Sequence, residues 1–286
     1  MRIKDSELPL QPTGAVYHLN LFPEEIADNI IVVGDPGRVA AVSKYFDTIE
    51  CKKSNREINT HTGTYKGKRI SVLSTGMGTD NIDICLTELD ALANIDLKTR
   101  EVKETGRKFN IVRIGTCGAL QPDIDVNTFV ASEAGFGFDG LLHFYDYGNI
   151  SDEELVEAFV KHTGWNERLP YPYCVEGSKE LMNKIGFDMT HGITASAGGF
   201  YGPQGREIRA KLKYPDLNSK IDTFNYNGRR ITNLEMETSA LYGLSKMLGH
   251  NALTVCVAIA NRVTKEFSKD YHPAVDALIQ TVLERI

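Results

Sequence analysis

The chain has 286 residues, 42% of them apolar and 24% charged, which is the composition of an ordinary globular protein rather than a disordered or fibrous one. The net charge is -6 and the Lys and Arg residues are scattered, so the sequence offers no electrostatic footprint for nucleic acid or an anionic membrane. The sequence contains no run of 18 apolar residues, and its first residues lack the pattern of a signal peptide. We therefore expect a cytoplasmic protein that acts on a small molecule.

Cysteine usage and the absence of a linker restrict the architecture further. The five cysteines are odd in number, widely spaced and free of any CxxC pair, which disfavours both a disulfide framework and a zinc site. We expect reduced, mostly buried thiols, with neither a structural metal nor an organic cofactor. No linker-like stretch divides the chain, so one domain spanning residues 1–286 is the simplest interpretation.

Three short apolar runs in the first half of the chain predict buried strands. Each is rich in β-branched residues and leads into a glycine-containing turn: 30–33 before Gly34, 70–73 before Gly76 and 111–114 before Gly115. Runs of this kind suit strands buried on both faces, as in a parallel or mixed sheet covered by helices.

The second half supplies the predicted helices. Residues 136–176 are rich in aromatic residues and look like a long excursion from the core, with the character of a lid, a subunit contact or a surface insertion. Within them, SDEE at 151–154 has the pattern of a capping box and predicts a helix that stops near Gly164. Similar patterns predict three further helices, over 178–185, 237–248 and the segment after Pro273, and a fourth strand over 254–259. This order predicts an α/β fold with a central mixed sheet flanked by helices.

Two loops that follow predicted strands suit phosphate. In open α/β sheets, ligands bind beyond the carboxyl ends of the strands. GDPGR at 34–38 combines the flexible backbone of Gly34 with the guanidinium of Arg38, and RIGTCG at 113–118 supplies Arg113 and the Thr116 hydroxyl. Glycine lets the backbone approach an anion closely, and Arg offers forked donors to its oxygens. Neither loop matches a nucleoside-triphosphate or dinucleotide motif, and either one alone is also explained as a plain turn.

Two other segments suit a nucleoside. NLEMET at 233–238 places Glu237 where a strand meets a helix, and its carboxylate could accept hydrogen bonds from a ribose diol. The simpler explanation is an acidic residue favoured by the helix dipole. FYGPQGR at 200–206 combines an aromatic platform, Phe200, with Gln204 and Arg206, which match the hydrogen-bonding edge of uracil. The simpler explanation there is a solvated loop.

Taken together, these motifs resemble the uridine phosphorylases of the nucleoside phosphorylase family. The resemblance covers most of the chain in the expected order, and this order is more specific than any single motif. Its segments are VYHL at 16–19, GDPGR at 34–38, SNRE at 54–57, STGMG at 74–78, VRIGTCG at 112–118, FYGPQGR at 200–206, NLEMET at 233–238 and ANR at 260–262. The resemblance implies a mixed sheet with flanking helices and a homo-oligomer, either a dimer or a hexamer made of dimers.

The resemblance also implies a role for each matching residue. Phosphate would be bound by Gly34, Arg38, Arg113 and Thr116, with Arg56 from a neighbouring subunit. Ribose would be bound by Thr116, Met236 and Glu237, with His18 from the neighbour near O5′. The base would stack on Phe200 and form hydrogen bonds to Gln204 and Arg206. Arg262 would support Arg206 without contacting the base itself. The residues expected to act in catalysis are Arg113, Gln204 and Arg206.

The sequence departs from the family at two places. Pro203 stands directly before Gln204, where relatives usually have glycine, and could shift the base-binding loop. Some bacterial members bind a monovalent cation through a Glu, a backbone carbonyl and a Ser. Glu57 and Met77 match the first two, but Asn81 stands at the position of the Ser, so a cation at Glu57 is only a possibility.

The implied reaction is the reversible phosphorolysis of uridine to uracil and ribose 1-phosphate, without a covalent enzyme intermediate. One alternative is a purine or broad-specificity nucleoside phosphorylase. Purine enzymes protonate N7 with an Asp after the last core strand, where this chain has Asn261, which cannot act as the acid. An alternative of another class is a non-catalytic nucleoside-binding protein, which would be expected to lack some phosphate arginines.

Overall fold

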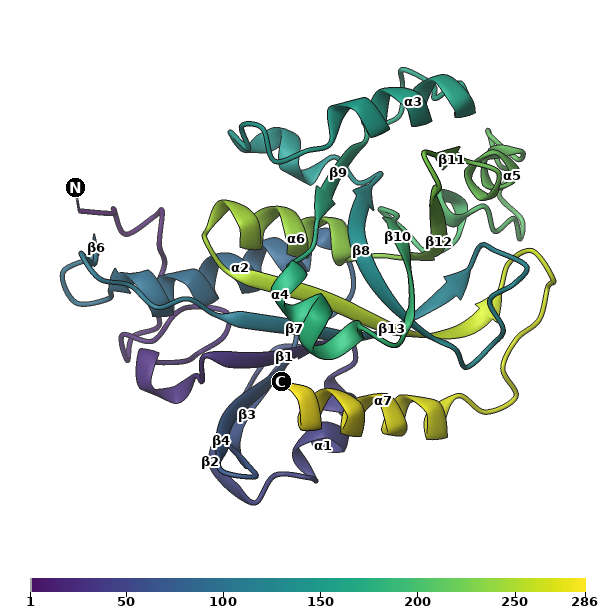
Figure 1. The fold of residues 1–286 in the computed structure, drawn as a ribbon. Coiled ribbons are helices and arrows are strands. Elements are labelled where there is room, and N and C mark those ends of the chain that lie inside the picture. The colour runs from purple at the N-terminus through teal and green to yellow at the C-terminus, as the bar shows by residue number, and fades with distance from the viewer. Residues whose placement is uncertain (1) are drawn as a thin grey trace.

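A mixed β-sheet carries the other elements of the chain (Figure 1). The structure, a computed structural model, describes residues 2–286, and within them the sheet has 11 strands in the order β11-β12-β10-β8-β13-β7-β1-β4-β3-β2, with β9 paired to β8. Its strands are β1 (Asn29–Val33), β2 (Thr48–Asn55), β3 (Ile58–Tyr65), β4 (Lys68–Ser74), β7 (Asn110–Ala119), β8 (Phe129–Gly137), β9 (Tyr173–Glu176), β10 (Thr190–Ser196), β11 (Asn225–Tyr226), β12 (Arg229–Glu235) and β13 (Asn251–Asn261). A separate pair joins β5 (Ile95–Asp96) to β6 (Glu101–Val102).

The centre of the sheet is parallel. β1 lies between β4 and β7, and β13 runs parallel to β7 on its other side. An antiparallel pairing of β12 with the end of β7 closes β7, β13, β8, β10 and β12 into a ring. The carboxyl ends of β1, β4, β7 and β13 therefore meet at one edge of the sheet.

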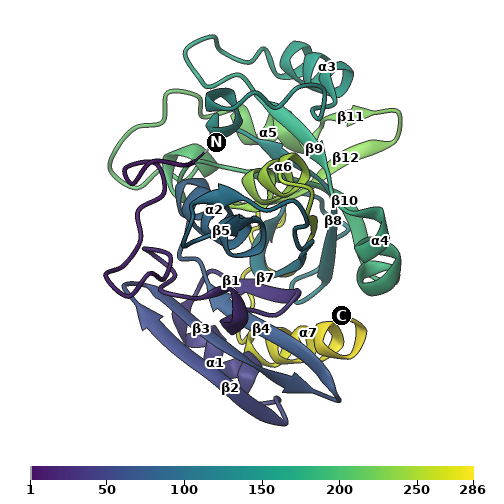
Figure 2. The same cartoon turned by 90° about the vertical axis from the view of Figure 1, so that its left-hand side faces the viewer.

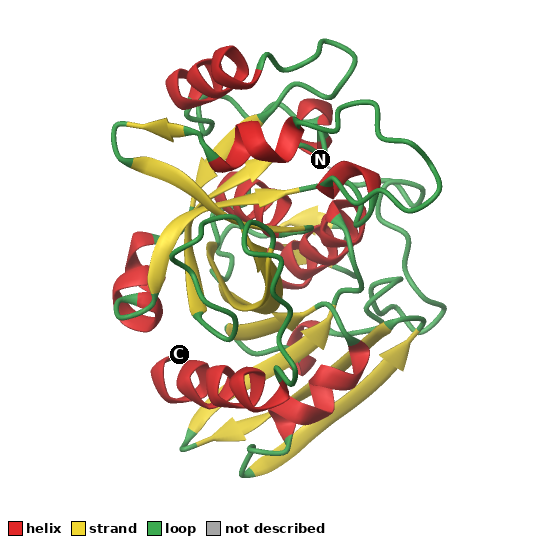
Figure 3. Ribbon diagram, turned by 90° about the vertical axis from the view of Figure 1, so that its right-hand side faces the viewer, coloured by secondary structure: helices red, strands yellow, loops and turns green. Residues whose placement is uncertain are grey.

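Helices cover both faces of the sheet (Figures 2 and 3). They are α1 (Pro36–Ser43), α2 (Thr79–Asn94), α3 (Glu153–Thr163), α4 (Lys179–Leu181), α5 (Leu217–Asp222), α6 (Thr238–Met247) and α7 (His272–Arg285), with short turns η1 (Pro23–Glu25), η2 (Leu141–Phe144), η3 (Met182–Gly186) and η4 (Gly202–Gln204). No helix within residues 2–286 combines the length and apolar character needed to cross a membrane.

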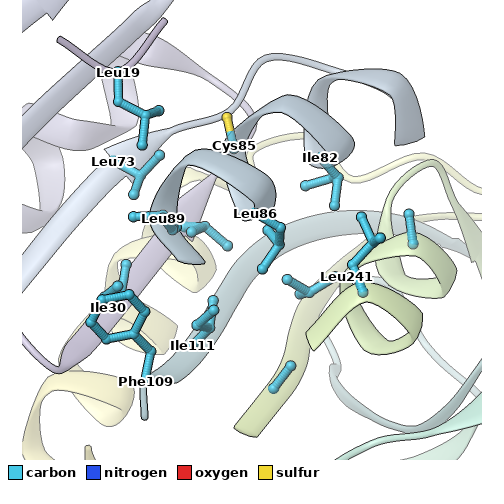
Figure 4. Close-up of a cluster of buried hydrophobic side chains, with 14 of the residues drawn as sticks. Leu19, Ile30, Leu73, Ile82, Cys85, Leu86, Leu89, Phe109, Ile111 and Leu241 are labelled. Carbon is cyan, nitrogen blue, oxygen red and sulfur yellow. The ribbon is translucent and has the colours of Figure 1, made fainter. Parts of the chain in front are cut away.

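The alternation of β1 divides the core into two layers. Ile30 and Val32 pack with α2 and α6, whereas Ile31 and Val33 pack with α1 and α7. Successive strand side chains point to opposite faces, so a continuous apolar run is what a strand buried on both sides requires. Figure 4 shows the first layer, where Leu86 and Leu89 of α2 lie above Ile30 and Ile111 of the sheet. The predicted α/β architecture is confirmed.

The predicted strands are confirmed, but one prediction about glycine is wrong. The run 111–114 does not end in a turn at Gly115, because β7 continues to Ala119. A Cβ at position 115 would lie 2.1 Å from Nη1 of Arg113, and one at position 118 would lie 3.2 Å from Cγ of Arg262. These glycines therefore make room for arginine side chains that fold back against the strand.

The predicted helices are also present, with local differences. The helix at 153–163 ends at Gly164 in the left-handed region, but Asp152 caps its start and accepts from the Leu155 N–H at 3.2 Å. The predicted cap, Ser151, instead accepts from the Cys174 N–H. The helix predicted over 178–185 changes after three α-helical residues into a π-helical turn, Met182–Gly186.

Residues 136–176 are not wholly an excursion, because several of their segments belong to the core. They contain the end of β8, helix α3 and strand β9, which pairs with β8. Leu155, Val156 and Phe159 of α3 pack against Phe136 and Ile193 of the sheet. All five cysteines within residues 2–286 are free and only Cys51 is not fully buried, as expected.

Candidate active site

A cavity of about 700 Å³ opens at the carboxyl ends of β1, β4, β7, β12 and β13, beside the loop that follows β10. It brings together most of the site residues predicted from the sequence. The cavity is lined by Gly34, Arg38, Glu57, Arg113, Thr116, Phe200, Gln204, Arg206, Met236 and Glu237. Three of the predicted residues, His18, Arg56 and Arg262, are outside this lining.

Arg113 of β7 is the buried centre of the cavity wall. Its Nη2 donates to Oε2 of Glu237, and its Nη1 lies 3.2 Å from Oε2 of Glu235 and 3.4 Å from Sγ of Cys256. Burial acts to lower the pKa of Arg113, but the charges of Glu237 and Glu235 outweigh it and raise the pKa above its usual value. Arg113 is therefore a permanent cation with a fixed direction.

Glu235 is a functional residue that the sequence reading missed. It lines the cavity, and its carboxylate accepts from the backbone N–H groups of Glu237 at 3.0 Å and Thr238 at 3.1 Å. It also accepts from the Ser196 hydroxyl at 2.6 Å. Glu235 thus satisfies the start of α6 and orients Arg113. The signal was its spacing of two residues from Glu237, which places both side chains on one face of an extended segment.

Glu237 is turned into the cavity rather than towards its own helix. Its Oε1 accepts from the Gly78 N–H at 2.8 Å, and its own side chain makes no capping bond to α6. Burial raises its pKa and the neighbouring Glu235 adds to this, while Arg113 opposes both. Interaction with the start of α6 therefore does not explain Glu237. It explains Glu235, whose carboxylate accepts from the first N–H groups of this helix.

Arg38 brings a second cation to the same wall. Asp35 caps α1 by accepting from the Gly37 N–H at 2.8 Å, and the first turn of the helix then presents Arg38 to the cavity. Its Nη1 donates to the Ile114 carbonyl at 3.3 Å. Burial lowers the pKa of Arg38, and the like charge of Arg113 lowers it further. Two guanidinium groups in mutual repulsion are well suited to bind an anion between them.

Gln204 and Arg206, from the loop after β10, form another part of the cavity lining. Nη1 of Arg206 donates to Oε1 of Gln204 at 2.5 Å and to the Phe200 carbonyl at 2.6 Å. Cζ of the Arg206 guanidinium lies 3.8 Å from the centroid of the Phe200 ring, so the guanidinium covers one face of this ring. Pro203 forms the short turn η4 and leaves the buried Gln204 side chain facing the cavity, so it does not turn this loop away.

Arg262 lies outside the cavity lining but acts on this end electrostatically. Burial together with the charge of Arg262 lowers the pKa of Arg206 to about 10. Within residues 2–286, Nη1 of Arg262 is buried without a hydrogen-bond partner. In the part of the chain that the structure describes, neither Arg206 nor Arg262 forms an ion pair with a carboxylate, so the positive charge beside Gln204 is not neutralised.

Asn261 does not face the cavity. Its Nδ2 donates to the carbonyls of Gln121 at 2.8 Å and Ile124 at 2.9 Å, and its Oδ1 accepts from the N–H groups of Val263 and Thr264. All of its hydrogen-bonding capacity is thus used to fix the loop after β13. An Asp at this position would place a carboxylate against two carbonyl oxygens.

His18 and Arg56 lie together away from the cavity of their own chain. Asn55 of β2 donates to the His18 carbonyl at 2.8 Å, and the Arg56 guanidinium lies 5.8 Å from the Tyr17 ring centroid. Arg56 is at the tip of the β2–β3 hairpin with a φ of 53°. The structure therefore places neither residue in the cavity of its own chain, whereas the resemblance assigns both to the cavity of a neighbouring subunit.

The residues considered for a monovalent cation do not fit one as arranged. Glu57 and Met77 line the cavity, but Nδ2 of Asn81 donates to the Met77 carbonyl at 3.1 Å. This amide presents a donor where a cation needs an oxygen, and it engages the carbonyl that would be a ligand.

Comparisons with known proteins agree with this geometry. A model of the phosphorylase superfamily matches residues 28–286. A uridine phosphorylase of Thermococcus kodakarensis is 32% identical over 92% of this chain and 84% of its own length. A DeoD-type purine nucleoside phosphorylase of Colwellia psychrerythraea is 28% identical over 83% of this chain and 84% of its own length. The crystal structure of a Trypanosoma brucei nucleoside phosphorylase that shows uridine phosphorylase activity superposes with a TM-score of 0.88 at 32% identity, over 97% and 98% of the two chains.

Proposed function

We propose that this chain, which belongs to the phosphorylase superfamily, is a uridine phosphorylase that converts uridine and phosphate into uracil and ribose 1-phosphate. The observation that carries this proposal is that one cavity contains three chemically different groups of side chains. Arg38 and Arg113 are close enough to repel each other, Gln204 and Arg206 are bonded together, and the Glu237 carboxylate accepts from Arg113.

The base end selects uracil by its row of hydrogen-bonding groups. Oε1 of Gln204 uses one lone pair for Arg206 and keeps the second, so Nε2, Oε1 and the guanidinium present donor, acceptor and donor. Uracil presents the complementary acceptor, donor and acceptor at O2, N3–H and O4. Cytosine lacks the N3 proton and carries an amino group at position 4, so it would leave two of these groups unpaired.

The chemistry is a displacement at C1′ that the protein stabilises at both ends. As the bond between N1 and C1′ breaks, its electrons move onto uracil, and Arg206 stabilises that developing anion. Phosphate held by Arg38 and Arg113, with Gly34 and Thr116 beside them, stabilises the cationic ribose and then bonds to C1′. Glu237 accepts hydrogen bonds from the ribose hydroxyls. The uracil anion gains a proton equal to the one that hydrogen phosphate loses on becoming the ribose monoester, so the reaction balances without a proton from the protein.

A purine nucleoside phosphorylase is the alternative of the same family, since relatives with that name match at 28% identity. The bonding of Asn261 supports the pyrimidine assignment, because its amide is used up by the loop it anchors. The test is an ultraviolet assay of base release from uridine, cytidine, thymidine, inosine and adenosine, each with and without phosphate. Phosphate-dependent cleavage of uridine, with cytidine and the purines at least about a hundredfold slower, is expected. Equal rates on inosine would overturn the assignment, and release without phosphate would indicate a hydrolase.

The site is completed by a second copy of the chain. His18 and Arg56 are side by side but outside their own cavity, so they are available to the cavity of a neighbour in a homo-oligomer, a dimer or a hexamer of dimers. Mixing His18→Ala subunits with Glu237→Ala subunits should restore part of the activity through hybrid sites. Verified mixed oligomers that remain inactive would count against a shared site. A cytoplasmic location stays a prediction from the sequence.

A non-catalytic nucleoside-binding protein is the alternative of another class. Both arginines that a single chain contributes to phosphate, Arg38 and Arg113, line the cavity, and Arg113 is held by two carboxylates. A protein that only bound nucleosides would have no use for this arrangement. Phosphate-dependent turnover in the assay above distinguishes the two.

A further inference from the structure

A buried carboxylate of α2 lies at the centre of a cluster that the proposed mechanism does not explain. The N-terminal cluster consists of Tyr17, His18, Asn55, Arg56 and Glu88, and none of its members lines the cavity of their own chain. Glu88 is only 6% exposed, and buried carboxylates are rare unless their oxygens are paired.

All of the partners of Glu88 come from the N-terminal segment. Its carboxylate accepts from the backbone N–H groups of His18 and Leu19, each at 2.8 Å, and Oε1 lies 2.7 Å from Nδ1 of His18. An ionised carboxylate can only accept hydrogen bonds, so Nδ1 of His18 must carry the proton. In the neutral imidazole the other nitrogen, Nε2, is then an acceptor.

The rest of the N-terminal cluster keeps the imidazole from turning. Asn55 holds the His18 carbonyl at 2.8 Å, and the Tyr17 ring packs edge-on against the imidazole with 5.0 Å between centroids. The His18 side chain is 26% exposed. Nδ1 is fixed inside the protein, and among residues 2–286 no group bonds to Nε2, so this acceptor is available to a group from outside the chain.

We propose that Glu88 is a positioning residue that fixes the tautomer of His18, so that Nε2 accepts a hydrogen bond from the 5′-hydroxyl of the nucleoside bound by a second copy of the chain. This rests on the shared site proposed above. A hydroxyl is the donor that the ribose offers at that end, and an acceptor set in advance binds it without the cost of turning the ring. The carboxylate thus selects nucleosides with a free 5′-hydroxyl.

The variant Glu88→Gln separates this role from that of a backbone anchor. Its amide oxygen can still accept from the His18 and Leu19 N–H groups, but its amide nitrogen faces Nδ1 and favours the tautomer with the proton on Nε2. The ¹⁵N chemical shifts of His18, assigned by comparison with His18→Ala, report which nitrogen is protonated. We expect Nδ1 protonation at neutral pH in the natural protein and a change in Glu88→Gln. A doubly protonated imidazole, or no change in the variant, would overturn the proposal.

Kinetics with uridine and 5′-deoxyuridine test the consequence for the substrate. Glu88→Gln should lower kcat/KM for uridine about tenfold, the scale of one hydrogen bond, and leave 5′-deoxyuridine unchanged. His18→Ala should do the same, and the double variant should be no worse than either single one. Asp90→Asn is the matched control, since Asp90 lies on the same helix but outside the N-terminal cluster. Its Oδ1 lies 3.2 Å from Nε2 of His250.

The outcomes separate the two proposals. If His18→Ala leaves uridine unaffected, the shared site and the role of Glu88 both fail. If His18→Ala lowers uridine efficiency but Glu88→Gln does not, only the role of Glu88 fails. If Glu88→Gln lowers uridine and 5′-deoxyuridine equally, the carboxylate is a structural anchor.

Discussion

Arg113 and Arg206 line different parts of one cavity and have opposite electrostatic surroundings. Arg113 belongs to a central strand, is buried and is paired with Glu235 and Glu237, which hold its pKa high. Arg206 belongs to a loop, its partners are neutral oxygens, and burial with Arg262 lowers its pKa to about 10. The same residue type is used once as a fixed anchor and once as an uncompensated charge.

This difference matches what each end is proposed to bind. Phosphate arrives as an anion and needs a cation that is already oriented. Arg113 is that cation, and the two buried carboxylates fix its orientation. Uracil arrives neutral and becomes anionic only as the bond to ribose breaks. A positive charge without a carboxylate neighbour interacts more strongly with the anion than with the neutral base, so it favours the transition state.

The largest effect is expected from Arg113→Ala. It removes a phosphate ligand and leaves Glu235 and Glu237 buried without their cation, so turnover should fall by about two orders of magnitude or more. Steady-state kinetics with uridine and phosphate measure this, together with the melting temperature to account for lost stability. Arg285→Ala, which breaks a surface pair with Asp188, is the control. Near-normal phosphorolysis by a folded Arg113→Ala protein would refute the phosphate assignment.

The next effect concerns the choice of base. Gln204→Ala or Arg206→Ala should lower the efficiency with uridine and erase most of its advantage over inosine, while the purine rates stay low. Each unpaired buried group costs roughly 1–3 kcal/mol in the complex, which sets the scale of the preference. The same ultraviolet assay checks this on both substrates. An unchanged ratio of uridine to inosine would place the base elsewhere in the cavity.

A smaller effect is expected where the strand makes room for Arg113. In Gly115→Ala the new Cβ would lie 2.1 Å from Nη1 of Arg113 and 2.9 Å from Sγ of Cys256, so the guanidinium must move. We expect the KM for phosphate to rise about tenfold, with a loss of stability of about 1–3 kcal/mol from overpacking. The KM for uridine should change less. Gly198→Ala, whose Cβ would make an ordinary contact at 3.8 Å, is the control. A rise confined to the uridine KM would contradict this geometry.

The smallest effect is a shift in the alkaline limit of activity. Arg206 is charged below its pKa of about 10 and loses its proton as the pH rises through that value, so stabilisation of the uracil anion should fall there. Burial is the main cause of the low pKa and Arg262 the second, so Arg262→Leu should move the limit to higher pH. Rate profiles of both proteins from about two pH units below this midpoint to about two units above it check this. A limit unmoved by Arg262→Leu would show that another group sets it.

Continuous local segments were predictable from the sequence. The strands at 30–33 and 70–73 follow from apolar runs, because burial on both faces of a sheet requires them. Gln204 and Arg206 were found together because they are two residues apart on one short loop, and Arg38 because it lies in the first turn of the helix that follows β1. In these cases the chain itself places the side chains near one another.

Tertiary structure decided what depends on residues distant in the chain. Gly115 reads locally as a turn, but it is a strand residue whose missing side chain admits the guanidinium of Arg113. Glu235 binds Arg113, and Glu88 binds His18 from 70 residues away. Periodicity specifies which face of an element is buried, not which group on another element meets it. Local sequence patterns therefore determined the fold and most of the site residues. Tertiary packing alone decided the electrostatics of these residues and the separation of His18 and Arg56 from their own cavity.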